Sequence, residues 1–404
     1  MALKNPTEDE RKGYLGQCAL RLLKHFDVGQ SFLSDSLHNL YGGAMVSIIL
    51  FASSDIDIIK KLYQYRYPST TSRTPRPLIQ FHRFKANEFR LILLFAAPIF
   101  KSYLKPKIYK NYLLLVFAFH LAEFRSLRST DIDDIRFLLD SFLYEYPSLY
   151  TNRHNQQVIH SIDHVVQSVQ DYGQLSNYST FNFESLLGML RATVHSTKCH
   201  AKEIANTMNL LRLAVRNTLL EDFSNELKTM LEQIQRKKRV AATGKPTIQT
   251  QHHSIKLRMK QTVNETLYKD IQEIFRYDDI QLYQIVSIGT TRFTTRDFAK
   301  AKKNDDSCVL YRFNKSSHIG FIEHIVRVNQ KIFFKIKKVT IKENLTCTYG
   351  NRKFQCRNIS MGSYNNDENV FFIKPEDIIE KLVHYQEAAN SFYFFRFPTL
   401  CESS

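Results

Sequence analysis

Two histidines stand four residues apart, a spacing that could let both side chains bind one metal ion. His160 and His164 stand in VIHSIDHVVQSV, a segment in which apolar residues recur at helical spacing. On one helix, side chains four apart project from the same face about one turn apart, which suits half of a metal site. A zinc site needs two further ligands, so a pair of partly exposed histidines on an amphipathic helix is the competing interpretation.

Two carboxylates could take part in a second kind of chemistry, the binding of divalent cations. Glu184 lies twenty residues after His164 in the apolar run FNFESLL, and Asp35 lies in SDSLHNLYGGAM, before the pair Gly42-Gly43. Either carboxylate could simply cap a helix, because the dipole of a helix favours an acid near its N-terminus. Either could also be one of the acids that hold a divalent cation.

The elements that must position these residues change in type near residue 240. Before that point, helical periodicity predicts seven helices: 43–64, 86–103, 107–126, 130–146, 156–171, 183–195 and 201–236. After residue 280, apolar and polar residues alternate as in strands, and we expect one helix at 374–388, beginning at Pro375. The predicted fold class is α+β, a mostly helical region followed by a small β-barrel-like domain.

A basic segment separates the two regions. Residues 236–260 have eight Lys and Arg and no Asp or Glu. The eight are Arg236, Lys237, Lys238, Arg239, Lys245, Lys256, Arg258 and Lys260. With Gly244 and Pro246 among polar residues, this composition predicts a mobile linker over 237–262. Its cations could contact DNA phosphates, and RKKR could direct nuclear import, or the segment could be a solvated tether.

The composition of the whole chain favours a polyanionic partner. The 404 residues include 56 Lys and Arg against 39 Asp and Glu, a net charge of +17, and 43% are hydrophobic. Such a chain is globular rather than disordered or fibrous, with length for two or three domains. Nucleic acid is the first partner to consider and an acidic membrane surface the second.

Two further features of the sequence concern membrane association and the cellular compartment. The most apolar runs, 91–100 and 112–122, are shorter than the roughly 20 residues of a membrane span, so we expect buried helices and no membrane partner. The six cysteines are scattered and form no CxxC pair, which predicts a reducing compartment rather than secretion.

Three segments taken together resemble a family of DNA transposases. DSLHNLYGGA (35–44) resembles the segment around the second catalytic Asp of CACTA-type transposases of animal lineages. FHRFKANEFRLILLFAAPIFK (81–101) resembles their K-A-x-E-F-R segment, and 155–191 is similar to their H-x-x-x-H, Gly and F-x-F-E pattern. The resemblance covers about residues 10–215, with a looser match near the end of the chain.

The resemblance implies roles for the candidate residues. Asp35 would match the second acid and Glu184 the third acid of an RNase H-like site, in which two divalent cations activate water and then a 3′-hydroxyl. His160 and His164 would match the histidine half of a zinc site. The 34 residues before Asp35 read as helix and loop, without the strand that holds the first acid in the family, and no CxxC completes the zinc site. Zinc is therefore one expected cofactor, and Mg²⁺ is expected only if the catalytic site is completed.

The sequence thus predicts four segments and one main function. The segments are a partial transposase core (1–65, a remnant of the RNase H-like fold), a helical transposase-associated domain (66–236), the basic linker (237–262) and a β-rich domain (263–404). We expect a transposon-derived, nuclear, DNA-binding protein without strand-transfer activity, and the oligomeric state stays open.

Two alternatives remain. One is an active DDE transposase or nuclease whose first acid comes from upstream sequence or from a partner. The other is a chromatin- or protein-interaction module whose β domain presents aromatic residues to a protein partner. The aromatic residues concerned are Tyr283, Phe293, Tyr311, Phe313 and Phe321. Aromatic residues at alternating strand positions more often belong to the core.

Overall fold

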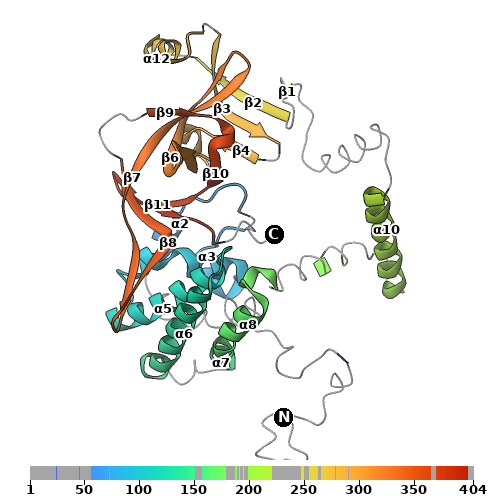
Figure 1. Cartoon of the computed structure of the whole chain (residues 1–404), viewed down its shortest axis with the longest axis vertical. Helices are drawn as coiled ribbons and strands as arrows, with labels where there is room; N and C mark the ends of the chain where they lie inside the picture. The colour runs from blue at the N-terminus through green and yellow to red at the C-terminus, as the bar shows by residue number, and fades with distance from the viewer. Residues whose placement is uncertain are drawn as a thin grey trace, which may run out of the picture.

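The chain consists of helices followed by an antiparallel sheet (Figure 1). The computed structural model describes residues 56–71, 73–150, 157–178, 199–220, 247–249, 254–262, 265–277, 279–289, 291–364 and 370–398, together with Lys24, Met45, Leu187, Gly188, Arg191 and Val194. Helices occupy the first half of the described chain and strands most of the second half. The predicted α+β class is confirmed at this level.

Two buried helices form the centre of the helical part. Helices α3 (Ala86–Phe95) and α5 (Pro106–Ala122) are buried along most of their lengths. The other described helices are α2 (Ile56–Tyr63), η3 (Leu78–Arg83), α4 (Ala97–Phe100), α6 (Ser129–Leu149), α7 (Gln157–Asp163), α8 (Val165–Tyr172), η5 (Leu175–Asn177) and α10 (His200–Leu220). Helix α6 packs along α5, and α7 and α8 pack on α6. No helix among the described residues is long and apolar enough to cross a membrane.

The sequence explains why α5 is buried on every side. Pro106 begins the helix at a position where its missing N–H is not needed. From Tyr112 to Phe119 every residue is apolar, so no face of this stretch favours solvent. The predicted helices at 86–103, 107–126 and 130–146 are found as α3 with α4, α5 and α6. Most of the predicted helices at 43–64 and 183–195, and residues 221–236 of the last one, lie outside the described residues.

Twelve strands of the described residues form the sheet. They are β1 (Thr247–Gln249), β2 (Ser254–Gln261), β3 (Ile280–Ile288), β4 (Thr291–Thr294), β5 (Cys308–Phe313), β6 (Ser316–Val328), β7 (Lys331–Tyr349), β8 (Arg352–Ser363), β9 (Val370–Ile373), β10 (Ile378–Lys381), β11 (Val383–Ala388) and β12 (Ser391–Phe395). Their order is β1-β2-β3-β6-β7-β8-β12-β11, with β4 beside β3, β9 beside β7, and β5 between β6 and β10. Helices α12 (Glu265–Phe275) and α13 (Arg296–Lys300) lie between strands in the sequence.

Tight turns set the register of the central strands. Asn314 and Lys315 join β5 to β6, and Asn329 and Gln330 join β6 to β7; all four have positive φ. Two-residue turns of this kind match the twist of a hairpin, and Asn tolerates positive φ better than most residues. The first half of β7 pairs with β6 and β9, while its second half pairs with β8. Strand β7 therefore runs through both halves of the sheet (Figure 1).

The predicted barrel is not closed. In the upper half of the sheet the order is β10-β5-β6-β7-β9, and no ladder joins β9 to β10 or β5 within the described residues. The short helix η7 (Pro375–Asp377) instead connects β9 to β10 and contacts both β5 and β7. The rings of Phe313 and Phe371 lie 4.7 Å apart between β5 and β9. Side chains rather than hydrogen bonds therefore bridge the two strands, and we call this place the β5–β9 seam.

Two predictions for the second half of the chain are wrong. The segment 374–388 is not a helix but η7 followed by β10 and β11. Leu382 and Val383 pack in different hydrophobic clusters, as adjacent residues of an extended chain do. The predicted linker 237–262 contains β2, because Ile255 and Leu257 alternate with Lys256 and Arg258 and bury one face of the strand. The β-rich region therefore begins before residue 263.

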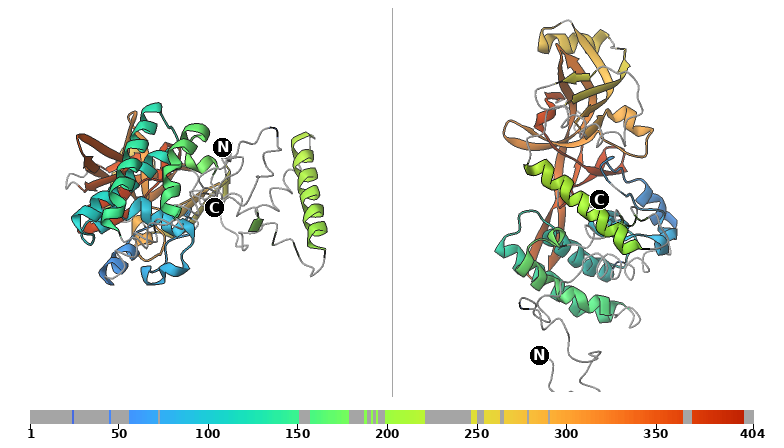
Figure 2. Two further views of the ribbon diagram at one scale, coloured as in Figure 1. Left: turned by 90° about the horizontal axis from the view of Figure 1, so that it is seen from below. Right: turned by 90° about the vertical axis from the view of Figure 1, so that its right-hand side faces the viewer.

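The helical part shares one hydrophobic core with the lower half of the sheet, which consists of the second half of β7 with β8, β11 and β12. Cys347, Phe354, Cys356, Ile359 and Phe395 belong to the same hydrophobic cluster as α3, α5 and α6. Figure 2 shows these helices packed closely against the sheet in two further views. His120 of α5 accepts a hydrogen bond from Asn358 of β8, with 3.3 Å between the nitrogens.

A buried carboxylate fastens the extended segment before α3 to the sheet. Asp306 is fully buried and accepts hydrogen bonds from the Ser69 amide, Arg292 Nε and Lys381 Nζ, each at 2.8 Å. Burial alone would raise the pKa of Asp306, but Lys381, Ser69 and Arg292 together hold it below its usual value. Arg66 also pairs with His384 of β11 through backbone hydrogen bonds in both directions.

Candidate nucleic-acid interface

Most residues proposed from the sequence lie outside the described part of the chain. These are Asp35, Glu184, Arg236, Lys237, Lys238, Arg239 and Lys245, so their positions are not tested. His160 lies in α7, but its side chain is also outside the description. His164, Lys256, Arg258 and Lys260 can be placed.

The helix expected to present both histidines is interrupted at His164. Helix α7 ends at Asp163 and α8 begins at Val165. The His164 amide donates to the Ser161 carbonyl, three residues back, and the His164 carbonyl accepts from Ser168. The prediction of one continuous helix over 156–171 is therefore wrong at this point, because a tighter turn lies between the two histidines. The His164 side chain is exposed.

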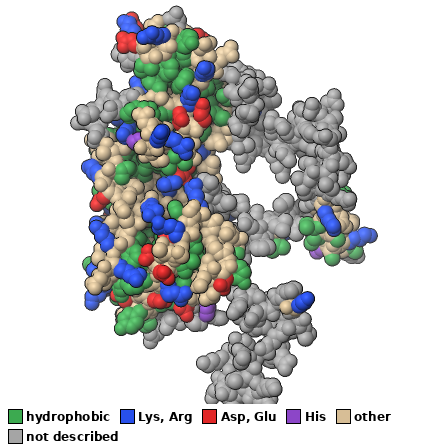
Figure 3. Space-filling view, viewed as in Figure 1, with side chains coloured by type: hydrophobic (Ala, Val, Ile, Leu, Met, Phe, Trp, Pro, Cys, Tyr) green, Lys and Arg blue, Asp and Glu red, His purple; other side chains and the backbone are tan. Residues whose placement is uncertain are grey.

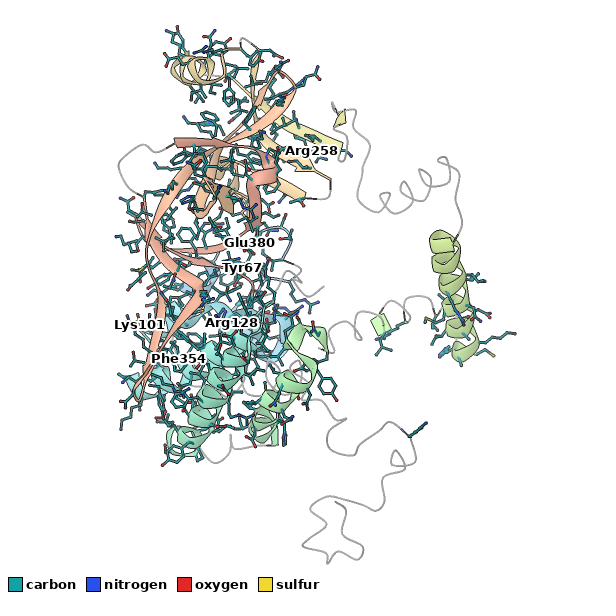
Figure 4. All side chains as sticks on the ribbon, in the orientation of Figure 1. Tyr67, Lys101, Arg128, Arg258, Phe354 and Glu380 are labelled. Carbon is teal, nitrogen blue, oxygen red and sulfur yellow. The ribbon has the colours of Figure 1, made fainter. Side chains whose placement is uncertain are left out.

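The last three cations of the predicted linker lie on β2. Lys256 is partly buried, while Arg258 and Lys260 are exposed. Figure 4 labels Arg258 at the upper right of the molecule, far from Phe354, where the sheet meets the helices. Strand β2 pairs with β3, so these cations stand on an ordered edge of the sheet rather than on a mobile tether.

A denser group of cations lies on the neighbouring strands and was missed in the sequence. Residues 312–342 have eight Lys and Arg and only one acid, Glu323. The eight are Arg312, Lys315, Arg327, Lys331, Lys335, Lys337, Lys338 and Lys342, here called the β6–β7 cations. None of them forms a salt bridge with an Asp or Glu of the described residues. The feature of the sequence that could have revealed this group is the net charge of +7 over these 31 residues.

Successive side chains of a strand point to opposite faces, so the lysines of β7 lie on both faces of the sheet. Lys335 lies opposite His324 of β6, and Lys337 lies opposite Phe321. Lys335 and Lys337 therefore lie on the same face of the sheet, which we call the outer face. Helix α12 covers the end of this face near Lys331, through Ile271 and Phe275. Ile336 and Lys338 belong to the inner face, the latter opposite Gly320.

Beyond α12, the outer face contains a cluster of cations and aromatic rings. The Arg296 guanidinium lies 4.5 Å from the centre of the Phe321 ring, 4.7 Å from Tyr364 and 5.4 Å from Phe392. Arg296 also donates to the Tyr364 hydroxyl, and Lys337 Nζ lies 5.0 Å from the same ring. Burial lowers the pKa of Arg296 from its usual value, but a guanidinium titrates so high that its charge is retained.

His324 lies beside these cations on β6. Its Nδ1 is buried without a hydrogen-bond partner among the described residues. Burial first, and then the Lys335 charge, lower its pKa, so the imidazole is neutral at neutral pH. A neutral imidazole offers one donor and one acceptor and adds no charge to the face.

Basic side chains are not confined to the sheet. Figure 3 shows Lys and Arg at many places along the visible face, from the α12 end down to the helices. On the helical part, Lys101, Lys105 and Lys107 are exposed. The β6–β7 cations differ in density, because a single acid accompanies eight of them in sequence.

The aromatic residues proposed as a protein-binding surface are mostly core. Tyr283, Phe293, Tyr311 and Phe321 are at most 6% exposed. Only Phe313 of the five is partly exposed. The interpretation of alternating aromatic residues as core is confirmed for four of them.

Within the described residues, no group of three or more His, Cys, Asp and Glu side chains could hold a metal ion. Cys199, Cys308, Cys347 and Cys356 are free thiols. Burial raises the pKa of Cys347 to about 11 and that of Cys356 to about 12, so both stay protonated and unreactive.

Comparison with known proteins gives no relative. No protein-family model, curated protein or solved structure matches the chain. The resemblance to CACTA-type transposases therefore stays a prediction from the quoted segments.

Proposed function

We propose that this protein binds nucleic acid and that the β6–β7 cations are its main contact with the phosphate backbone. The observation that supports the proposal most is the charge of residues 312–342, with eight cations and one acid on adjacent strands. A Lys or Arg side chain that has no carboxylate partner can bind a phosphate without first breaking an ion pair within the protein. Such binding releases the counterions that surround the nucleic acid. The three cations of β2, two strands away, extend the same positive region.

The test compares two triple variants of equal charge change. In the first, Lys331, Lys335 and Lys337 become Gln. In the control, Lys101, Lys105 and Lys107, exposed on the helical part, become Gln. We expect the affinity for a fluorescent oligonucleotide, measured by anisotropy at low salt, to fall at least tenfold in the first variant and less than threefold in the control, because each phosphate contact contributes separately. Equal losses would mean that net charge alone governs binding.

We further propose, from the resemblance to CACTA-type transposases, that the protein is transposon-derived, acts in the nucleus and does not transfer strands by itself. The chain offers Asp35 and Glu184 as two acids of the family's site and no counterpart of the first acid. Two-metal chemistry needs the full set of ligands. We therefore expect no nicking of supercoiled DNA with Mg²⁺ or Mn²⁺. Nicking that disappears in Asp35→Ala or Glu184→Ala would instead support the active transposase.

A further inference from the structure

We propose that the β5–β9 seam binds an unpaired nucleobase, so that the protein prefers single-stranded to duplex nucleic acid. This inference rests on the proposed nucleic-acid binding and names the form of nucleic acid and one contact point. The seam consists of two aromatic rings, Phe313 of β5 and Phe371 of β9, with Lys338 and Lys315 nearby.

The two rings are close together and only partly covered. Their centres lie 4.7 Å apart with an angle of 56° between the planes. Phe313 and Phe371 are both partly exposed, whereas the aromatic residues deeper on the inner face, such as Phe334, are fully buried. The pair therefore lies where the hydrophobic cluster of the inner face meets solvent.

Two cations lie near this pair. Lys338 Nζ lies 5.7 Å from the centre of the Phe371 ring, and Lys315, which is exposed, stands in the turn two residues after Phe313. Arg312 belongs to the opposite face of β5, because adjacent side chains of a strand alternate. Neither Lys338 nor Lys315 forms a salt bridge with a described carboxylate. A strand of nucleic acid that placed a base against Phe313 could set its phosphates near both charges.

Gly320 of β6 lets neighbouring side chains of the inner face pack closely. A side chain there would lie 2.4 Å from Ile336 Cγ2 and 3.2 Å from the Tyr311 ring. The Tyr311 ring therefore packs on the bare backbone at Gly320, and its hydroxyl is buried with no hydrogen-bond partner among the described residues. Burial raises the pKa of Tyr311 to about 12, so this hydroxyl remains a donor.

The chemistry of the seam fits a base better than a cationic peptide. Every nucleobase has a flat face that stacks on an aromatic side chain, and such stacking is tolerant of sequence. A methylated lysine also binds aromatic rings, but Lys338 and Lys315 would repel it. In a duplex the bases are paired and stacked on one another, so their faces are not available to Phe313.

The chain has no tryptophan, which makes a direct experiment possible. In Phe313→Trp the only indole stands at the seam; in the control, Tyr144→Trp, it stands at an exposed position of α6 in the helical part. Stacking of a base on an indole quenches its fluorescence. With an oligothymidylate of about fifteen nucleotides, a length within the usual site size of single-strand binders, we expect the indole fluorescence to be quenched in Phe313→Trp and unchanged in Tyr144→Trp.

Affinity gives the second readout. Phe313→Leu keeps an apolar side chain in the cluster but removes the stacking surface. We expect its affinity for the oligothymidylate to fall about tenfold and its affinity for a duplex of equal length to change less than twofold. Binding of both nucleic acids without quenching in Phe313→Trp, or equal losses in Phe313→Leu, would overturn the seam and leave the proposed function intact. Binding of neither would overturn the proposed function itself.

Discussion

His120 and His384 are buried as neutral imidazoles, and this makes the fold sensitive to acid. His120 Nε2 lies 2.8 Å from the Leu94 carbonyl, to which the neutral ring can donate. Burial lowers the pKa of each histidine from 6.5 to about 4. The unfolded chain therefore binds protons below about pH 6.5 that the folded chain accepts only below about pH 4. The stabilisation is complete above pH 6.5 and is lost as the pH falls toward 4.

A first prediction follows from these histidines. Between pH 7 and pH 5, each should reduce the free energy of unfolding by about 2 kcal/mol, since one pKa unit corresponds to about 1.4 kcal/mol. Urea denaturation at the two pH values checks this in the wild type and in His120→Gln and His384→Gln. In each variant the difference between the two pH values should shrink by about 2 kcal/mol. An unchanged difference would mean that the histidine is protonated in the folded chain.

At the scale of single elements, close approach of strands at Gly320 gives the second prediction. A Cβ at this position would lie 2.4 Å from Ile336 Cγ2 and 2.7 Å from the Lys337 carbonyl oxygen, so β6 and β7 would have to separate. We expect Gly320→Ala to destabilise the protein by about 1–3 kcal/mol, as overpacking does in cores. Thermal unfolding of Gly188→Ala, where nothing lies within 4 Å of the added carbon, is the matched control. Equal stability of the two variants would contradict the tight packing of β6 on β7.

The elements also show how far sequence patterns could be followed. The buried helices α3 and α5 could be predicted from the sequence, because long apolar runs bounded by Pro98 and Pro106 fit few structures other than a buried helix. Strand β2 was missed because its charges hid a short alternation of Ile255 and Leu257. The segment 374–388 was read as a helix because Pro375 and the following acids suit a helix start. Pairing with β5 and β12 overrides that local preference.

The candidate site was less predictable than the fold. The sequence pointed to the basic residues around 236–260, of which the structure places only Lys256, Arg258 and Lys260. The excess of cations in 312–342 is equally visible in the sequence, but alternating lysines in a strand usually mean a solvated face. The approach of Phe313 to Phe371 depends on the curvature of the sheet across four strands. No local pattern encodes such a contact between residues 58 positions apart.

At the scale of the whole molecule, the shared core gives a third prediction. Cys347 and Cys356 lie between the sheet and the helices and are buried at 4% and 3% exposure. In a chain whose other four cysteines, Cys18, Cys199, Cys308 and Cys401, are replaced by Ala, we expect these thiols to react slowly with a thiol reagent, because they are protonated and covered. A fragment of residues 247–404 with the same replacements of Cys308 and Cys401 should react at least tenfold faster. Equal protection in the fragment would show that the sheet covers these thiols without the helices.

Nucleic-acid binding by the β6–β7 cations is the central claim, and the salt dependence of affinity tests it most directly. Each phosphate contact contributes about 0.9 to the slope of log affinity against log salt for a duplex and about 0.7 for a single strand. In the variant with Gln at 331, 335 and 337, the slope for the oligothymidylate should become shallower by about 2, whereas the control with Gln at 101, 105 and 107 should keep the wild-type slope. A slope unchanged by the first variant, or lowered equally by both, would contradict the account.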